Sequence, residues 1–355
     1  MTTRHDPRVS WPQVLESLLR HEDLTEDLAA WVMATVMAGD AEPSQVAGLL
    51  VALRAKGEAP SEIAGFVRAM LDAAADIDLT DACRQRTVDV VGTGGDGADT
   101  FNISTIAAVV VAASGQPVAK HGNRAASSAC GSADLLEGWG IDLDMRAADV
   151  AICIEELGIG FLFARTFHPA MRVVAPVRQQ LGVRTVFNLL GPLSNPAHAP
   201  AMAVGVADER LASVMAEAMV RLGKRHVLLF RGRDGLDELT TTGPSQLWEV
   251  ADGQVTTSEL DPSDLGLDRA TPEQLRGGDV AVNVAIADAV LAGERGPHRD
   301  IVLLNAAAGL YAADAVDSLE GGIARAEATI DDGAAEDLKR RWVERSRQLK
   351  EAARG

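Results

Sequence analysis

A glycine-rich segment at residues 92–105 contains the first residues whose types and spacing could do chemistry. It reads Gly-Thr-Gly-Gly-Asp-Gly-Ala-Asp-Thr-Phe-Asn-Ile-Ser-Thr and follows a short β-like run at 88–91. Glycines let a backbone approach an anion closely, and a helix that starts near Ser104 and Thr105 offers unpaired N–H groups. The segment therefore predicts a phosphate-binding loop between a strand and a helix.

The same segment also fits the dinucleotide-binding fingerprint, as Gly92-x-Gly94-x-x-Gly97. That interpretation needs an acidic residue at the end of the next strand, where it would hold the ribose hydroxyls. The next strand, expected at 117–119, instead runs into Lys-His-Gly-Asn-Arg at 120–124. These cationic residues suit a further phosphate, so we prefer phosphate binding to dinucleotide binding and to a glycine turn without a ligand.

A second polar loop extends from Lys120 to Asp134 and also contains Ser127, Ser128 and Ser132. Its positive charge is unusual in a chain with 33 Lys and Arg against 51 Asp and Glu, a net charge of −18. An isolated basic turn is often only solvated. Because the carboxyl ends of neighbouring parallel strands face one crevice, we expect this loop to share a site with the glycine-rich segment.

Two adjacent carboxylates, Asp237 and Glu238, follow a β-like run at 227–230. Consecutive acidic residues on a loop are usually just exposed. Beside two phosphate-binding loops, however, they suit Mg²⁺, which prefers oxygen ligands and keeps waters and substrate phosphates. We therefore predict a magnesium site at this position.

A candidate binding face for a flat apolar acid lies at residues 168–178. If a helix starts at Pro169, one of its faces carries residues 168, 171, 175 and 178, which are His, Met, Ala and Arg. The guanidinium of Arg178 could then grip a carboxylate in bidentate fashion. A surface arginine on a packing helix explains the spacing equally well, and spacing alone does not separate the two.

The elements expected around these residues divide the chain into two domains, at 1–82 and 83–355. Residues 1–82 have only helical periodicity, with a capping box at Ser10 and Gln13, an apolar stripe at 46–53 that ends at Gly57, and a helix from Pro60. Later β-like runs at 88–91, 117–119, 185–187, 201–206 and 227–230 alternate with helical segments such as 105–114 and 210–222. We predict a small all-helical domain followed by an α/β domain with a mostly parallel central sheet flanked by helices. The stretches 252–268 and 293–300 are expected to be surface loops.

The composition excludes several classes of function. The net charge of −18 disfavours nucleic acid and anionic membranes as partners. The three cysteines, Cys83, Cys130 and Cys153, lack C-x-x-C spacing, which excludes a disulfide framework and a cysteine-based zinc site. No apolar run resembles a signal peptide or a membrane span, so we expect a cytoplasmic protein.

Four segments together resemble the anthranilate phosphoribosyltransferase family: 90–105, 118–137, 160–196 and 234–243. The helical N-terminal segment resembles this family too. Two motifs are specific to this family when they occur together: Gly-Thr-Gly-Gly-Asp at 92–96 and Lys-His-Gly-Asn-Arg at 120–124. Either motif alone is shared more loosely with pyrimidine nucleoside phosphorylases. The resemblance implies transfer of the phosphoribosyl group of phosphoribosyl pyrophosphate (PRPP) to the amino group of anthranilate, with release of pyrophosphate, in tryptophan biosynthesis.

The resemblance also implies roles for individual residues. The catalytic set would be Lys120, Asn123 and Arg178, of which Asn123 and Arg178 would bind anthranilate. Two Mg²⁺ ions would be coordinated by Ser104, Asp237 and Glu238. The residues implied to contact the substrates are Gly92, Gly95, Asp96, Thr100, Asn102, Ile103, Ser104, Thr105, Lys120, His121, Gly122, Asn123, Arg124, Ser127, Ser128, Ser132, His168, Met171 and Arg178.

The implied reaction is an oxocarbenium-like displacement without a covalent intermediate, because Mg²⁺ and the loop donors can stabilise the leaving pyrophosphate. The implied assembly is a homodimer formed through the helical domain, to which residues of about 169–192 would also belong. Two residues depart from the family pattern: Cys130, where Ser is common, and Met171, where some members carry an aromatic. The alternatives are a nucleoside phosphorylase, which would ignore anthranilate, and a nucleic-acid-binding relative, which the net charge disfavours.

Overall fold

The computed structural model describes residues 10–125 and 129–353. Two of the predicted substrate contacts, Ser127 and Ser128, lie outside these residues.

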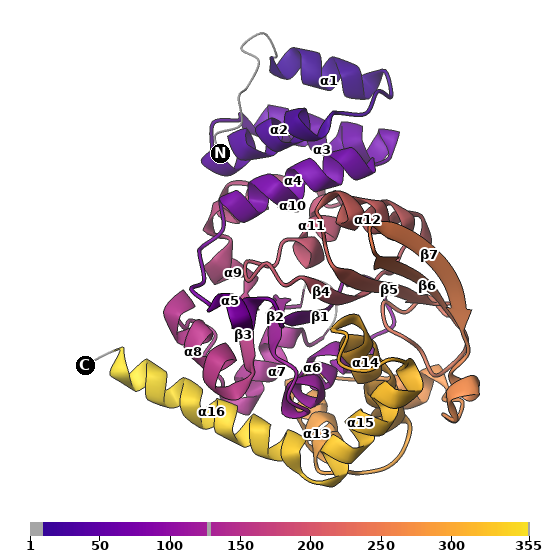
Figure 1. Cartoon of the computed structure of the whole chain (residues 1–355). Helices are drawn as coiled ribbons and strands as arrows, with labels where there is room; N and C mark the ends of the chain where they lie inside the picture. The colour runs from indigo at the N-terminus through magenta and orange to yellow at the C-terminus, as the bar shows by residue number, and fades with distance from the viewer. Residues whose placement is uncertain (1–9, 126–128, 354–355) are drawn as a thin grey trace.

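A bundle of helices comes first in the chain and lies at the top of Figure 1. Its members are α1 (Trp11–Leu19), α2 (Glu26–Ala38), α3 (Pro43–Lys56) and α4 (Pro60–Asp72). The predicted capping box precedes α1, where the Ser10 N–H donates to Gln13 Oε1 at 2.8 Å. Gly57, with φ of +92°, ends α3 as predicted. The prediction of a small helical N-terminal part is confirmed.

A seven-stranded sheet forms the centre of the larger part, in the order β3-β2-β1-β4-β5-β6-β7. The parallel strands are β1 (Val88–Gly92), β2 (Val118–Gly122), β3 (Ile159–Phe163), β4 (Ala201–Gly205) and β5 (His226–Gly232). An antiparallel hairpin at one edge consists of β6 (Ser245–Ala251) and β7 (Gln254–Leu260). The predicted mostly parallel sheet is therefore confirmed.

Helices cover both faces of this sheet (Figure 1). Alternate residues of β4 explain why, since Ala201 and Ala203 pack into one core with α6 and α14, whereas Met202 and Val204 pack into a second core with the bundle. The helices outside the bundle are α5 (Asp81–Arg84), α6 (Ile103–Ala113), α7 (Ser132–Trp139), α8 (Ala147–Leu157), α9 (Ala164–Phe167), η1 (Pro169–Val173), α10 (Ala175–Leu181), α11 (Phe187–Leu193), α12 (Glu209–Arg221), η2 (Pro262–Leu265), η3 (Pro272–Leu275), α13 (Val280–Leu291), α14 (Pro297–Ala312), α15 (Leu319–Asp331) and α16 (Ala334–Ala352).

The strand predicted at 185–187 is wrong, because Phe187 begins α11. The N–H of Thr185 donates to the Asn188 side chain at 3.0 Å, a local contact that competes with strand pairing. The loops predicted at 252–268 and 293–300 are also wrong in part, because β7 occupies Gln254–Leu260, η2 occupies Pro262–Leu265 and α14 begins at Pro297. Both faces of β7 carry polar or exposed residues, so the strand has no alternating pattern to detect.

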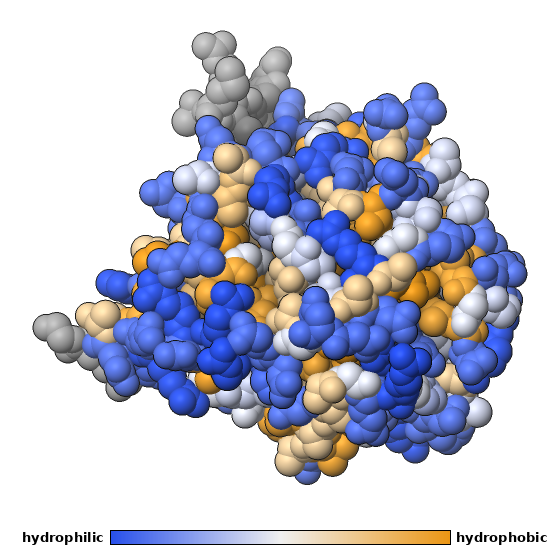
Figure 2. Space-filling model, turned by 60° about the horizontal axis from the view of Figure 1, so that its bottom comes forward, coloured by the Kyte–Doolittle hydropathy of each residue, from blue (hydrophilic) through white to orange (hydrophobic). Residues whose placement is uncertain are grey.

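The face of the molecule seen in Figure 2 is covered mainly by hydrophilic residues, with hydrophobic ones in small separate groups. This agrees with the large excess of acidic side chains. Within residues 10–125 and 129–353, no helix combines the length and apolar character needed to cross a membrane.

Candidate active site

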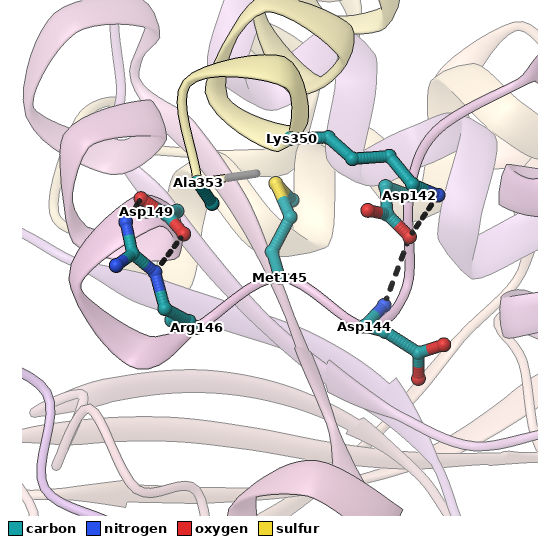
Figure 3. A pocket seen from close by; sticks show the side chains of 7 residues that line it. All are labelled: Asp142, Asp144, Met145, Arg146, Asp149, Lys350 and Ala353. Carbon is teal, nitrogen blue, oxygen red and sulfur yellow. Dashed lines mark hydrogen bonds and ion pairs between the residues drawn. The ribbon is translucent and has the colours of Figure 1, made fainter. Parts of the chain in front are cut away.

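One hollow of about 230 Å³ lies away from all the residues predicted to do chemistry (Figure 3). Its charged side chains pair with one another, Arg146 Nε with Asp149 Oδ2 at 2.8 Å and Lys350 Nζ with Asp142 Oδ1 at 3.2 Å. The first pair lies at the start of α8, and the second joins Asp142 to the last turns of α16. The candidate site lies instead at the carboxyl ends of the parallel strands.

The glycine-rich segment and the acidic pair meet at this edge of the sheet. The N–H of Gly94 donates to Asp237 Oδ2 at 2.6 Å, and the N–H of Ser104 donates to Glu238 Oε1 at 3.2 Å. The acidic pair therefore reaches both ends of a segment that lies more than 130 residues earlier in the chain. Lys120, in the middle of β2, joins them through its Nζ, which lies 3.4 Å from Ser104 Oγ. The predicted convergence of three loops is thus observed.

The electrostatics of the acidic pair favour a cation. Burial raises the pKa of Asp237 to about 7, with a further contribution from the negative charge of Asp96. Burial likewise raises the pKa of Glu238, to which Asp237 adds repulsion while Lys120 acts in the opposite direction. Mg²⁺ prefers oxygen ligands, and a cation would relieve the repulsion between these two carboxylates.

The available metal ligands fit an ion that takes only part of its coordination shell from the protein. Among the described residues, no three His, Cys, Asp or Glu side chains are arranged to hold a metal. Two carboxylates and the Ser104 hydroxyl leave positions for waters and for a ligand phosphate, which is how Mg²⁺ is usually bound.

Two glycines make room for Asp237. A Cβ at Gly92 would overlap the Asp237 carboxylate, and a Cβ at Gly205, at the end of β4, would overlap the Asp237 backbone oxygen. Asp237 therefore reaches Gly94 across β4 only because both positions lack a side chain.

We predict that Gly205→Ala lowers kcat by about 100-fold, because a shift of Asp237 by a fraction of an ångström misplaces the acidic pair. Gly321→Ala is the matched control, since its added Cβ would meet only ordinary contacts, the nearest at 3.7 Å. Steady-state rates and melting temperatures of both variants check this prediction. Wild-type kcat in Gly205→Ala would show that the backbone contact does not position Asp237.

Lys120 is buried at 2% exposure and interacts electrostatically with Glu238 and with a third carboxylate, the buried Asp89. Its Nζ donates to the Val90 carbonyl as well as to Ser104. Burial lowers the pKa of Lys120, and the charges of Asp89 and Glu238 act in the opposite direction. Its hydrogen bonds therefore fix the Lys120 side chain behind the glycine-rich segment.

Asp89 fixes the strand that carries Lys120. Its carboxylate accepts the N–H of His121 at 3.1 Å and the side-chain amide of Asn195 at 2.7 Å. Burial raises the pKa of Asp89 to about 6, while Lys120 is the largest influence in the opposite direction. Asp89 and Asn195 lie in or beside segments that carry the motifs and the resemblance. Neither was among the predicted site residues, because the sequence does not show that the two side chains contact each other.

His121 and His168 lie side by side, with ring centroids 5.1 Å apart. His121 Nδ1 lies 3.0 Å from the Gly191 carbonyl, and His168 Nε2 lies 2.9 Å from the Ser194 carbonyl. Burial lowers the pKa of both, that of His121 to about 3, so both imidazoles are neutral at pH 7. A neutral His121 must donate through Nδ1, which leaves a buried Nε2 acceptor with no partner among the described residues.

The shared face at 168–178 depended on a continuous helix from Pro169, and the structure does not have one, because the segment divides into η1 and α10. Pro176 explains the break: it lacks an N–H and its ring crowds the carbonyl four residues earlier. Arg178, on α10, is partly buried with its guanidinium 5.5 Å from the Phe187 ring centroid. It makes no ion pair with any described residue, and burial lowers its pKa. This cation is therefore available to a carboxylate.

Several residues that were predicted to contact the substrates form ion pairs or hydrogen bonds within the protein. Arg124 pairs with Asp134 and Glu137 on α7, each at 2.8 Å, so its charge is compensated. The Asn123 side-chain oxygen accepts the Arg124 N–H at 2.8 Å, and the Asn123 backbone carbonyl accepts the Ser132 hydroxyl at 3.1 Å. These contacts shape the second polar loop.

Asn102 and Thr105, at the start of α6, also face the protein. The Asn102 amide donates to the Cys130 carbonyl at 3.0 Å and accepts from Asn283 Nδ2 at 2.9 Å. The Thr105 hydroxyl is buried without a partner among the described residues. Thr100 forms a backbone bridge to Arg276, and Ile103 is buried in the core. Asn283 was missed because it lies on α13, far along the chain from every motif.

Arg184 is a further residue that the sequence did not indicate. It lies between α10 and α11, and its guanidinium donates to the carbonyls of Gly95 at 2.9 Å and Gly94 at 3.4 Å. Arg184 lies in the segment 160–196 that carries the resemblance, but the local pattern beside it was the β-like run at 185–187, which predicted a strand rather than a loop.

Comparisons with known proteins agree with this geometry. Residues 12–74 match the family model described as "Glycosyl transferase family, helical bundle domain", and residues 84–336 match "Glycosyl transferase family, a/b domain". The fold and site thus define a glycosyltransferase. A curated relative named anthranilate phosphoribosyltransferase, from Arthrobacter sp. (strain FB24), is 51% identical over 340 residues, which cover 94% of this chain and 95% of the relative. The chain belongs to the anthranilate phosphoribosyltransferase family.

Solved structures support the same assignment. The anthranilate phosphoribosyltransferase of Thermus thermophilus matches with a TM-score of 0.88 at 49% identity, covering 94% of this chain and 99% of that chain. The Saccharomyces cerevisiae enzyme in complex with PRPP and Mg matches with a TM-score of 0.81 at 28% identity, covering 96% of this chain and 94% of that chain.

Proposed function

We propose that this chain transfers the phosphoribosyl group of PRPP to the amino group of anthranilate in tryptophan biosynthesis, releasing pyrophosphate. Its curated relatives are named for this activity, and one similar solved structure, from Saccharomyces cerevisiae, is a complex with PRPP and Mg. The observation that carries the proposal is the contact of the acidic pair with Gly94 and Ser104 at both ends of the glycine-rich segment. This arrangement suits a pyrophosphate held between backbone N–H groups and a divalent cation.

Ser104, Asp237 and Glu238 would hold two Mg²⁺ ions. When bound, Mg²⁺ neutralises the charge that develops on the leaving pyrophosphate. The chain's own contribution on this side would be a set of fixed hydrogen-bond donors: the N–H groups of the glycine-rich segment and the Lys120 side chain. We assign Gly92, Gly95 and Asp96 to the same donor site.

Arg178 and Asn123 would bind the acceptor, with His121, His168 and Met171 along its path. Arg178 suits a carboxylate because it is partly buried and has no acidic partner among the described residues. His121 supplies a neutral acceptor Nε2, which could receive a hydrogen bond from the amine.

No side chain needs to form a covalent bond or act as a strong base. The amine of anthranilate is neutral at pH 7 and can lose its proton after the new C–N bond has formed. His121, with its pKa near 3, is a poor base, which agrees with this assignment. Catalysis then rests on placement of the amine and on stabilisation of the leaving group.

We further propose a cytoplasmic homodimer joined through the helical domain, comprising 1–82 and about 169–192, with 83–355 otherwise forming the PRPP-binding domain. The contacts of α10 with α3 and of α11 with α4 support this division. Leu19 and Val51, which are 67% and 50% exposed on α1 and α3, offer apolar surface for a second copy.

Growth complementation tests the proposed function. A bacterial strain that lacks anthranilate phosphoribosyltransferase should grow without tryptophan when it expresses this chain. Expression of folded protein without growth would count against the proposal.

A further inference from the structure

Arg184 and the acidic pair contact different backbone groups of the glycine-rich segment at residues 92–105, which is called the donor loop below. Its guanidinium donates to the Gly95 and Gly94 carbonyls, while Asp237 accepts the Gly94 N–H at 2.6 Å. Gly95 has φ of +79°, and a Cβ there would lie 2.5 Å from Arg184 Nη1. The close approach of the arginine therefore depends on glycine at this position.

The two carbonyl contacts fix the direction of two N–H groups. In a trans peptide unit the carbonyl and the following N–H point in opposite directions. Holding the carbonyls of Gly94 and Gly95 toward Arg184 therefore turns the N–H groups of Gly95 and Asp96 to the other side of the loop. Neither N–H has a hydrogen-bond partner within residues 10–125 and 129–353, so both are free to bind an anion.

The charge of Arg184 strengthens these donors. Arg184 is partly buried and makes no ion pair in the described part of the chain, so acidic side chains do not compensate its charge there. A carbonyl that accepts from a cation polarises its peptide unit, and the N–H of that unit becomes a better donor.

Arg184 also links the donor loop to the segment that carries Arg178. α10 and α11 lie between the bundle and the sheet (Figure 1), and α10 contacts α3 while α11 contacts α4 and β2. The backbone on both sides of Arg184 is therefore anchored by packed helices.

We propose that Arg184 is a positioning residue for the pyrophosphate of the donor: it holds the loop so that the N–H groups of Gly95 and Asp96 face the anion. This role rests on the proposed function. Arg184 acts through the loop, whereas Arg178 serves the acceptor, so the two arginines have separable effects.

Calorimetric titration of the full chain with inorganic pyrophosphate and Mg²⁺ tests this role, together with the KM values for PRPP and anthranilate. Arg184→Ala should raise the pyrophosphate Kd and the PRPP KM by about 10-fold or more, as expected when a charged hydrogen-bond donor is lost. The KM for anthranilate should change by less than about 2-fold. The pyrophosphate Kd and PRPP KM of Arg184→Lys should lie between those of the wild type and of Arg184→Ala, because an ammonium lacks the planar fork that reaches both carbonyls.

Arg172→Ala is the matched control, since Arg172 is exposed on η1 and should leave all three constants unchanged. A wild-type pyrophosphate Kd in Arg184→Ala would overturn the proposal, as would an equal rise in the anthranilate KM. If Arg184→Ala does not fold, Arg184→Lys decides alone by the same criterion. Wild-type protein that neither turns over nor binds pyrophosphate would instead refute the proposed function.

Discussion

The double variant Asp237→Asn, Glu238→Gln is expected to lose Mg²⁺-dependent turnover, with kcat reduced by about 1000-fold or more. Both amides keep the shape of the side chains and one oxygen acceptor each, so the contacts with Gly94 and Ser104 can persist. What disappears is the negative charge that would hold the metal. Rates measured across a range of Mg²⁺ concentrations check this result.

The stability of the same variant separates metal loss from damage to the fold. Burial raises the pKa of both carboxyls, which means that folding disfavours their charged forms. Neutral replacements should therefore leave the melting temperature of the ligand-free protein unchanged or raise it. Asp252→Asn, in the exposed turn between β6 and β7, is the control and should keep full activity. Substantial activity in the double variant would remove Asp237 and Glu238 as ligands.

Arg178→Ala is expected to raise the KM for anthranilate by about 100-fold, because a bidentate pair between guanidinium and carboxylate is lost from a partly buried position. The KM for PRPP should stay within about 3-fold of wild type. Steady-state kinetics with each substrate varied in turn separates the two constants.

Arg178→Lys refines this result. A lysine keeps the charge but not the fork or the contact with the Phe187 ring, so it should recover only part of the affinity. An equal rise in both KM values for Arg178→Ala would show that the carboxylate assignment is wrong.

The sequence predicts the donor side of the site well because its signals are local. The glycine-rich segment begins at the end of β1, Lys120 lies within β2, and the acidic pair comes a few residues after β5. The carboxyl ends of parallel strands lie at one edge of a sheet. Which residues touch one another is not local. Asp237 reaches Gly94 across β4, and only the sheet order together with Gly205 explains that contact.

The acceptor side was harder to predict because its backbone departs from regular patterns. Pro176 divides the helix expected from Pro169, so helical spacing could not place Arg178 relative to His168. The β-branched residues at 185 and 186 indicated a strand, whereas the structure has a turn there that brings Arg184 to the glycine loop. Long-range partners such as Asn195 and Asn283 leave no pattern near the motifs they support.

The fluorescence of anthranilate during incubation with the purified protein, PRPP and Mg²⁺ tests the central claim most directly. We expect the fluorescence to fall only when protein, PRPP and Mg²⁺ are all present, with one pyrophosphate released for each anthranilate consumed. Unchanged fluorescence with folded protein, or phosphate-dependent cleavage of a pyrimidine nucleoside in its place, would contradict it.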